Sequence, residues 1–132
     1  VSGWDTSSVT RFDYFAYGAS SLTTLDVSGW DTSSVTSFAY FAYGASSLTT
    51  VIVNGGTGSP FADSPCTNYG NAFVNTNLTQ QSIDDILVAI NAAGTSSGTF
   101  NQSGGSAPSA TGKAAVTALR GRGWTVTVTG GF

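Results

Sequence analysis

Apolar and polar positions repeat along the first half of the chain with a period of 26 residues. Residues 1–24 and 27–50 are near-copies that differ only at positions 11 and 13, where Arg11 and Asp13 are replaced by Ser37 and Ala39. The repeating unit carries one ordered apolar row, which comprises Leu22, Leu25, Val27, Trp30, Val35, Phe38, Phe41, Ala45 and Leu48. One unit cannot bury such a row alone, so tandem copies predict a stacked solenoid.

The spacing inside a unit combines a strand-like step with a helical one. Residues 25–27 alternate as a half-buried strand does, and Gly29 with residues 31–34 supplies the turn that follows. The apolar positions from Phe38 to Ala45 lie three and four apart, which suits a single helical or 3₁₀ turn. In stacked copies, equivalent side chains would lie over one another. The expected pairs are Trp4 with Trp30, Phe12 with Phe38, Phe15 with Phe41 and Leu22 with Leu48.

Residues 21–50, SLTTLDVSGWDTSSVTSFAYFAYGASSLTT, resemble the 26-residue repeat of bacterial surface proteins. That leucine-rich-repeat-like family reads roughly SLTxLDLSxWDTSxVTxMxxMFxxCxSL. The shared positions are Leu22, Leu25, Asp26, Val27, Trp30, Asp31, Thr32, Ser33, Val35 and Thr36. The chain departs by having Phe at 12, 15, 38 and 41, and Ala at 19 and 45 where the family often has Cys. The resemblance implies a solenoid used for display or adhesion, with no catalytic residues to transfer.

The second half of the chain changes period. Residues 61–78 are expected to form a third, irregular coil, and a helix is expected from Thr79, its N-cap, to Gly94. Its buried face would contain Ile83, Ile86, Leu87 and Ile90. A loop over 98–108 anchored by Phe100, a second helix over 108–120 and a strand over 124–129 are expected next.

These patterns predict an α/β fold: a short leucine-rich-repeat-like solenoid with a C-terminal cap. Residues 1–78 would supply about two regular coils plus one irregular coil, and residues 79–132 a helix–helix–strand cap packed on them as one globular unit. The cap segment resembles C-terminal segments of phage and cyanobacterial tail or surface proteins. The first coil lacks such a lid, so we expect self-association through it.

The low content of charged residues restricts the kinds of partner that the protein could bind. Only 8% of the residues are charged, four of them basic, and the net charge is −3. A nucleic-acid partner would need a basic stripe, which this composition does not provide. The longest apolar run, residues 86–90, falls far short of the ~20 residues of a spanning helix, so no membrane insertion is expected. Because Val1 begins in mid-pattern and Met is absent, we expect a processed product or a fragment.

The chain lacks His and Glu, which removes Ser-His-Asp and Cys-His arrangements and His-containing zinc sites. We therefore expect no enzyme activity, cofactor or metal. Cys66 stands alone and is expected to be a buried or loop thiol. Asp84 and Asp85 are interpreted as helix-start charges rather than an acid/base pair.

Three further motifs have simple structural interpretations. Asp5 and Asp31 recur one period apart, which suits a calcium ladder less well than a turn in which Asp bonds its own backbone. Residues 55–58 lack the Lys and helix start of a phosphate-binding loop. The basic cluster of Lys113, Arg120 and Arg122 is explained by a helix C-terminus.

The aromatic repetition supplies the candidate contact residues, which are Tyr14, Tyr17, Tyr40, Tyr43 and Trp4. Exposed tyrosines among Ser and Thr could pack against a partner subunit or stack on sugar rings; alternatively, they seal the edge of the core. Two functions remain open. The first is a non-enzymatic extracellular, cell-surface or virion structural protein that forms a homo-oligomer or filament, alone or with other subunits. The second is a glycan- or host-protein-binding adhesion module of a surface or phage tail-fibre protein.

Overall fold

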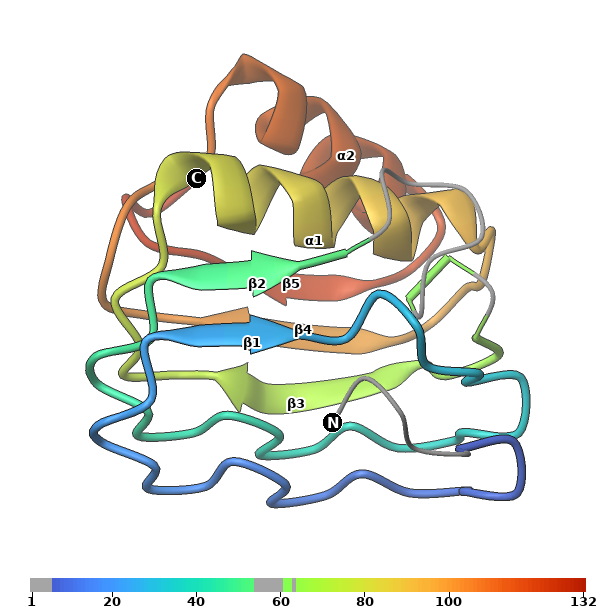
Figure 1. Ribbon diagram of the computed structural model, residues 1–132. Coiled ribbons are helices and arrows are strands. Elements are labelled where there is room, and N and C mark those ends of the chain that lie inside the picture. Colours follow the sequence, from blue (N-terminus) through green and yellow to red (C-terminus); the bar gives the residue numbers. More distant parts are fainter. Residues whose placement is uncertain (1–5, 54–60, 63) are drawn as a thin grey trace.

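The computed structural model describes residues 6–53, 61–62 and 64–132. In the described residues the chain forms two helices and five short strands. The strands are β1 (Thr24–Asp26), β2 (Thr50–Ile52), β3 (Asn68–Phe73), β4 (Thr99–Gln102) and β5 (Thr125–Thr127), and the helices are α1 (Gln80–Ala92) and α2 (Ala110–Gly121). They form two parallel sheets, β1-β2 and β3-β4-β5. Figure 1 shows successive passes of the chain lying one above another.

We call these passes coils: coil 1 is residues 6–26, coil 2 is 27–53, coil 3 the described part of 61–92, coil 4 is 95–121 and coil 5 is 124–132. Isolated parallel bridges join coils 1, 2 and 3, and the sheet β3-β4-β5 continues the same row into coils 4 and 5. The row consists of Arg11, Ser37, Asn68, Thr99 and Thr125. Residues 79–132 therefore continue the stack that the repeats begin.

Helix α1 lies beside β2, on the side opposite β1 (Figure 1). The Thr79 backbone N–H donates to the Thr49 carbonyl, and the Val51 N–H donates to Ser82 Oγ. As expected, Thr79 caps the helix, because its side chain accepts a hydrogen bond from the Ser82 N–H. Helix α2 packs on α1 and begins at Ala110 after its N-cap Ser109, later than the expected start at residue 108.

The expectation of a loop over 98–108 is wrong at its beginning, where residues 99–102 form strand β4. This strand lies between β3 and β5 and pairs with both in parallel, so its backbone groups are satisfied on two sides. Gln102 at its end is 1% exposed, and its amide donates to the carbonyls of Gly104 and Ser106 and accepts from the Thr129 N–H. Pairing with neighbours distant in sequence, rather than a local apolar pattern, makes this segment a strand.

Aromatic rings stack in a column through the core. Phe12 lies parallel to Phe38 at a centroid distance of 5.6 Å, and Phe38 lies parallel to Tyr69 at 5.2 Å. Phe15 stacks on Phe41 at 5.4 Å, as the repeat predicts. Trp4 lies outside the described residues, and Trp30 stacks instead on Phe12. Equivalent rings thus lie over one another because equivalent residues are brought into register by the coil stacking.

Candidate functional site

The four tyrosines lie together as two stacked pairs on coils 1 and 2. Tyr14 is parallel to Tyr40 at a centroid distance of 5.0 Å, and Tyr17 is nearly parallel to Tyr43 at 5.4 Å. Within coil 1 the rings of Tyr14 and Tyr17 are 5.2 Å apart and tilted. Each coil-1 ring therefore has one face against coil 2 and the other face directed away from it. Tyr14 and Tyr17 remain 55% and 52% exposed, whereas Tyr40 and Tyr43 are half-buried.

The backbone at two of these tyrosines is strained. Tyr14 and Tyr40 have φ angles of 62° and 57°, in the left-handed region that L residues with a bulky side chain seldom adopt. Coil 3 has Asn71 at the corresponding position with φ 56°, and Asn tolerates this conformation better. A tyrosine is thus held where its backbone is unfavourable, which is a feature common to functional surfaces.

The side of coil 1 that faces away from coil 2, which we call the N-terminal face, leaves its apolar row partly exposed. Val9, Phe15, Ala19 and Leu22 are all half-buried against the core. The residues one period later, Val35, Phe41, Ala45 and Leu48, are all 0% exposed. The two coils have the same apolar residues, and among the described residues coil 2 alone of the two lies between two other coils.

Hydrogen bonds between the coils run in one direction along the turn that carries the tyrosines. The N–H groups of Tyr14 and Gly18 in coil 1 donate to the carbonyls of Ala39 and Tyr43 in coil 2. Coil 2 repeats the pattern toward coil 3, where Tyr40 donates to Gly70. The corresponding coil-1 carbonyls, those of Asp13 and Tyr17, accept no hydrogen bond from any residue that the structure describes.

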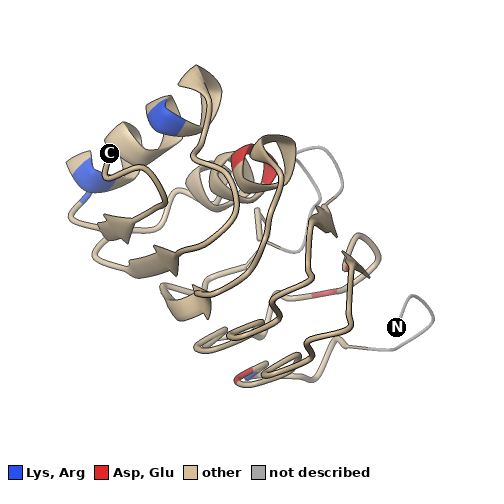
Figure 2. Cartoon of the chain, turned by 90° about the vertical axis from the view of Figure 1, so that its left-hand side faces the viewer, with Lys and Arg blue, Asp and Glu red and all other residues tan. Residues whose placement is uncertain are grey.

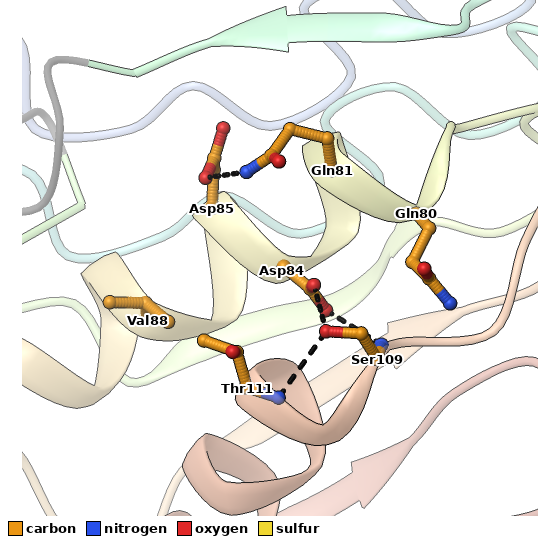
Figure 3. Close-up of a pocket in the computed structure, with 7 residues that line it drawn as sticks. All are labelled: Gln80, Gln81, Asp84, Asp85, Val88, Ser109 and Thr111. Carbon is orange, nitrogen blue, oxygen red and sulfur yellow. Dashed lines mark hydrogen bonds between the residues drawn. The ribbon is translucent and has the colours of Figure 1, made fainter.

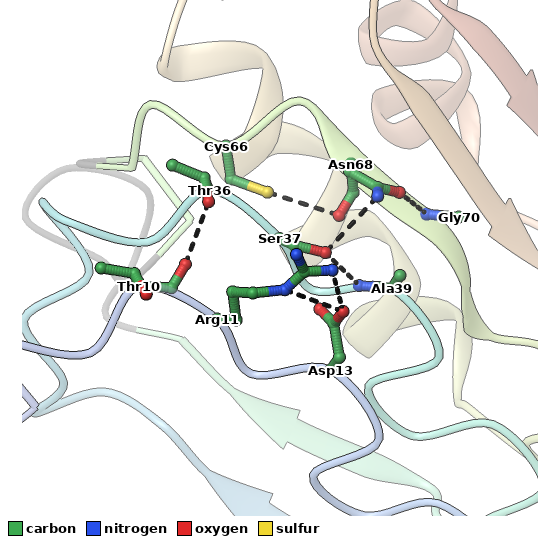
Figure 4. A network of polar contacts seen from close by, with 9 residues as sticks. All are labelled: Thr10, Arg11, Asp13, Thr36, Ser37, Ala39, Cys66, Asn68 and Gly70. Carbon is green, nitrogen blue, oxygen red and sulfur yellow. Dashed lines mark hydrogen bonds and ion pairs between the residues drawn. The ribbon is translucent and has the colours of Figure 1, made fainter.

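A polar network crosses coils 1, 2 and 3 beside the N-terminal face (Figure 4). Arg11 donates to Asp13 Oδ2 from Nε at 3.1 Å and from its terminal nitrogen at 2.5 Å. Burial acts to raise the pKa of the Asp13 carboxyl, but the Ser37 hydroxyl and Arg11 guanidinium outweigh it and hold that pKa below its usual value of 3.8. The Asn68 amide donates to Ser37 Oγ at 3.4 Å and extends the network into coil 3.

A second candidate is a groove of about 470 Å³ between α1 and α2 (Figure 3). Asp84 and Asp85 line it, together with Gln80, Gln81, Val88, Ser109 and Thr111. The helix-start interpretation of the two aspartates is wrong for their own helix, because the first turn of α1 contains no acidic residue. Asp84 instead accepts hydrogen bonds from the backbone N–H and hydroxyl of Ser109, the N-cap of α2. Its carboxylate therefore joins the two helices.

The remaining carboxylates of the coils stabilise turns. Asp31 Oδ1 accepts hydrogen bonds from the Ser33 N–H at 3.0 Å and from the Ser33 hydroxyl at 2.6 Å, which is the turn expected from the sequence. Asp26 binds Ser28 in the same way, and these hydrogen bonds lower the pKa of its carboxyl. Asp5 and residues 55–58 lie outside the described residues. No group of three or more His, Cys, Asp or Glu side chains gathers in the described parts of the chain.

Three of the four basic residues, Lys113, Arg120 and Arg122, lie in or directly after α2. Figure 2 shows basic positions of α2 far from coil 1. Arg120 donates to the carbonyls of Val126 at 2.7 Å and Phe132 at 2.5 Å, so it covers the outer edge of β5. Lys113 lies over the Phe132 ring, but it is in the first half of α2, so the helix C-terminus does not explain it. Arg122 binds Asn91 and Thr95 at the end of α1.

Cys66 is a buried free thiol, as expected, and is 1% exposed. Burial raises the pKa of its thiol to about 11, so the thiolate that nucleophilic chemistry requires is scarce at neutral pH. Tyr69 beside it is also buried, and desolvation raises the pKa of its hydroxyl well above the usual value of 10.0. The Tyr69 hydroxyl lies near Ser64 and Cys66 without forming a well-oriented hydrogen bond.

Residues 1–93 match the family described as "Mycoplasma protein of unknown function, DUF285", and the chain belongs to that family. It is a surface-associated repeat family whose function is unknown, in agreement with the bacterial surface repeat that the sequence resembles. No curated protein and no solved structure matches the chain. Among the described residues, neither helix has the length and apolar content needed to cross a membrane.

Proposed function

We propose that the protein is a non-enzymatic structural protein of an extracellular, cell-surface or virion assembly, and that it self-associates through the surfaces of its repeats. The fold that we propose for this role is a short leucine-rich-repeat-like solenoid. The observation that supports the proposal best is the contrast between two coils of nearly identical sequence. Phe15 and Leu22 are half-buried in coil 1, while Phe41 and Leu48 in coil 2 are 0% exposed.

Another coil or another subunit lying against coil 1 would cover its apolar row in the way that coil 3 covers that of coil 2. Removing apolar surface from water contributes about 25 cal/mol per Å², so a half-exposed row of four apolar residues favours association. The surface-associated family agrees with a location outside the cell, where low charge and abundant Ser and Thr suit a packed assembly.

The second candidate is an adhesion module that binds glycan or a host protein. Its support is the exposure of Tyr14 and Tyr17, at 55% and 52%, because exposed aromatic rings stack on sugars and on protein partners. Phage tail fibres and bacterial surface proteins are settings for this activity. The stacking of Tyr14 on Tyr40 and of Tyr17 on Tyr43 leaves one face of each coil-1 ring for such contacts.

Two assays on one pair of proteins separate these functions. The unmodified chain and a Tyr14→Asn/Tyr17→Ser variant are compared by sedimentation velocity over a concentration series and by binding to a glycan array. Both substitutions introduce residues that fit exposed positions, and Asn matches the left-handed backbone seen at Asn71. If the protein is structural, the variant should no longer assemble in sedimentation velocity, and neither protein should bind to the glycan array. If the protein is an adhesion module, both proteins should sediment as monomers, and the variant should lose the glycan binding that the unmodified chain shows.

A further inference from the structure

We infer that the stacked tyrosines of coils 1 and 2 are a site of oxidative cross-linking, at which a carbon–carbon bond between two phenol rings joins the coils covalently. The two bonds join Tyr14 to Tyr40 and Tyr17 to Tyr43. Each bond lies within one chain, so the modification is independent of the proposed self-association.

The rings of each pair are held in the same orientation. Tyr14 and Tyr40 have ring centroids 5.0 Å apart and planes that differ by 5°. Tyr17 and Tyr43 have centroids 5.4 Å apart and planes that differ by 11°. The members of a pair are equivalent residues of near-identical repeats, so like edges of the two rings lie side by side. Two reacting groups held together in this way couple far more readily than groups that must meet by diffusion.

The backbone fixes where two of these rings lie. The Tyr14 N–H donates to the Ala39 carbonyl at 3.2 Å, and the Tyr40 N–H donates to the Gly70 carbonyl at 2.9 Å. Both tyrosines have the left-handed φ that Asn71 adopts at the corresponding position of coil 3. Asn would be less strained at all three positions, yet the two stacked coils have tyrosine. A reaction that needs both phenol rings accounts for this choice.

The tyrosines are the accessible oxidisable groups. Tyr40 and Tyr43 lie in a coil that has a neighbour on each side, and they are still only half-buried. A further coil lying against coil 1 would leave both ring pairs in place. The chain contains no Met. The other readily oxidised side chains of the described residues are at most 5% exposed, and they are Trp30, Cys66, Tyr69 and Trp124.

The oxidant is hydrogen peroxide used by a haem peroxidase. Each phenol gives up one electron and its hydroxyl proton and becomes a phenoxyl radical, and the peroxide takes both electrons and both protons and becomes two water molecules. The radicals join through the ring carbons next to their oxygens, and the hydrogens on those carbons move to the oxygens to restore two phenols. The bond closes a loop between the coils, as a disulfide would, which the one cysteine of the chain cannot do.

Treatment of dilute native protein with a haem peroxidase and hydrogen peroxide tests the inference. We expect dityrosine fluorescence, and a loss of two hydrogen atoms per bond, in a product that keeps the 13.4 kDa mass of one chain. Cleavage before aspartate separates the coils, because two aspartates lie between Tyr17 and Tyr40. Residues 13–25 and 31–62 of this product should be recovered as one cross-linked peptide. Recovery of the two peptides apart, or cross-links only between chains, would overturn the inference.

Two matched double variants test the register of the pairs. Tyr14→Phe/Tyr40→Phe leaves the parallel pair of Tyr17 and Tyr43. Tyr14→Phe/Tyr43→Phe leaves Tyr17 and Tyr40, whose rings are 6.4 Å apart and tilted by 56°. Both variants keep every aromatic ring and one surface tyrosine on each coil. We expect the first to form the cross-link and the second to show a several-fold loss of yield, and equal yields would contradict coupling of the stacked pairs.

Discussion

Arg11 and Asp13 form an ion pair, with the Arg11 terminal nitrogen 2.5 Å from Asp13 Oδ2, and they are the two positions at which the repeat copies differ. In coil 2 the same positions are Ser37 and Ala39. The Ser37 Oγ accepts hydrogen bonds from the Asn68 amide and the Ala39 N–H, and the Ser37 hydroxyl also hydrogen-bonds the Asp13 carboxylate of coil 1. The two sequence differences are therefore one structural change. Among the described residues, the charged pair lies in the first coil of the stack, which has coil 2 as its neighbour.

This relationship predicts a non-additive mutant cycle. Arg11→Ser alone leaves Asp13 without its cation and should lower the free energy of unfolding by about 0.2–1 kcal/mol, the usual range for an exposed pair. Arg11→Ser/Asp13→Ala recreates the coil-2 sequence and should restore most of that loss. Chemical denaturation at neutral pH measures both.

The same cycle should depend on pH. Folding lowers the pKa of Asp13 from 3.8, first through the Ser37 hydroxyl and then through Arg11, so the ionised carboxylate stabilises the fold above pH 3.8, and this contribution is lost as the pH falls below that value. Additive effects at neutral pH, or a coupling that persists in acid, would contradict the assignment of Arg11 to Asp13.

Gly112 is predicted to be required for the close packing of α2 on α1. A Cβ at this position would overlap the Asp84 carboxylate and lie 2.7 Å from the Pro108 Cβ. Gly112→Ala should therefore lower the free energy of unfolding by about 1–3 kcal/mol, the range for overpacking. The control in the same helix is Gly121→Ala, where a Cβ meets nothing within 4 Å and a neutral or slightly stabilising effect is expected. The midpoints of thermal unfolding of the two variants should differ, and equal midpoints would contradict the close packing at Gly112.

Alkaline pH should lower the stability of the fold through its buried thiol. The unfolded chain releases the Cys66 proton near pH 9.0, whereas the folded chain retains it to about pH 11. This group therefore stabilises the fold fully below pH 9.0, and the contribution decreases by up to about 1.4 kcal/mol per pH unit as the pH rises toward 11. Cys66→Ala should flatten the pH dependence of chemical denaturation in this interval. An unchanged slope would show that Cys66 does not titrate with unfolding.

A thiol reagent provides a second measurement on the same residue. Native protein at pH 8 should react with an aromatic disulfide far more slowly than protein in denaturant, since Cys66 is 1% exposed. Equal reaction rates in the two conditions would contradict the burial of this side chain.

The sequence predicts those parts of the fold that depend on local pattern. The ring stacking of Phe12 on Phe38 follows from the 26-residue period, and α1 follows from the spacing of Ile83, Ile86, Leu87 and Ile90. Strand β4 was missed because its stability comes from β3 and β5, whose pairing has no signature within residues 99–102. The bridge of Asp84 to Ser109 was missed for the same reason, since it joins residues 25 positions apart.

The candidate site was predicted in part. The repeated tyrosines are together on coils 1 and 2, and Trp4 lies outside the described residues. The left-handed backbone conformation of Tyr14 and Tyr40 could not be predicted from a single sequence. Asn71, at the corresponding position of coil 3, is of a residue type that favours this conformation. The Arg11–Asp13 pair could have been found, because opposite charges two residues apart are the only differences between the copies.

Light scattering of the unmodified protein across a dilution series tests self-association, the central claim, most directly. The half-exposed apolar row of coil 1 predicts a particle larger than the 13.4 kDa chain, which dissociates only at the lowest concentrations. A mass of one chain at every concentration would contradict the structural function and favour the adhesion module, with Tyr14 and Tyr17 as its contact residues.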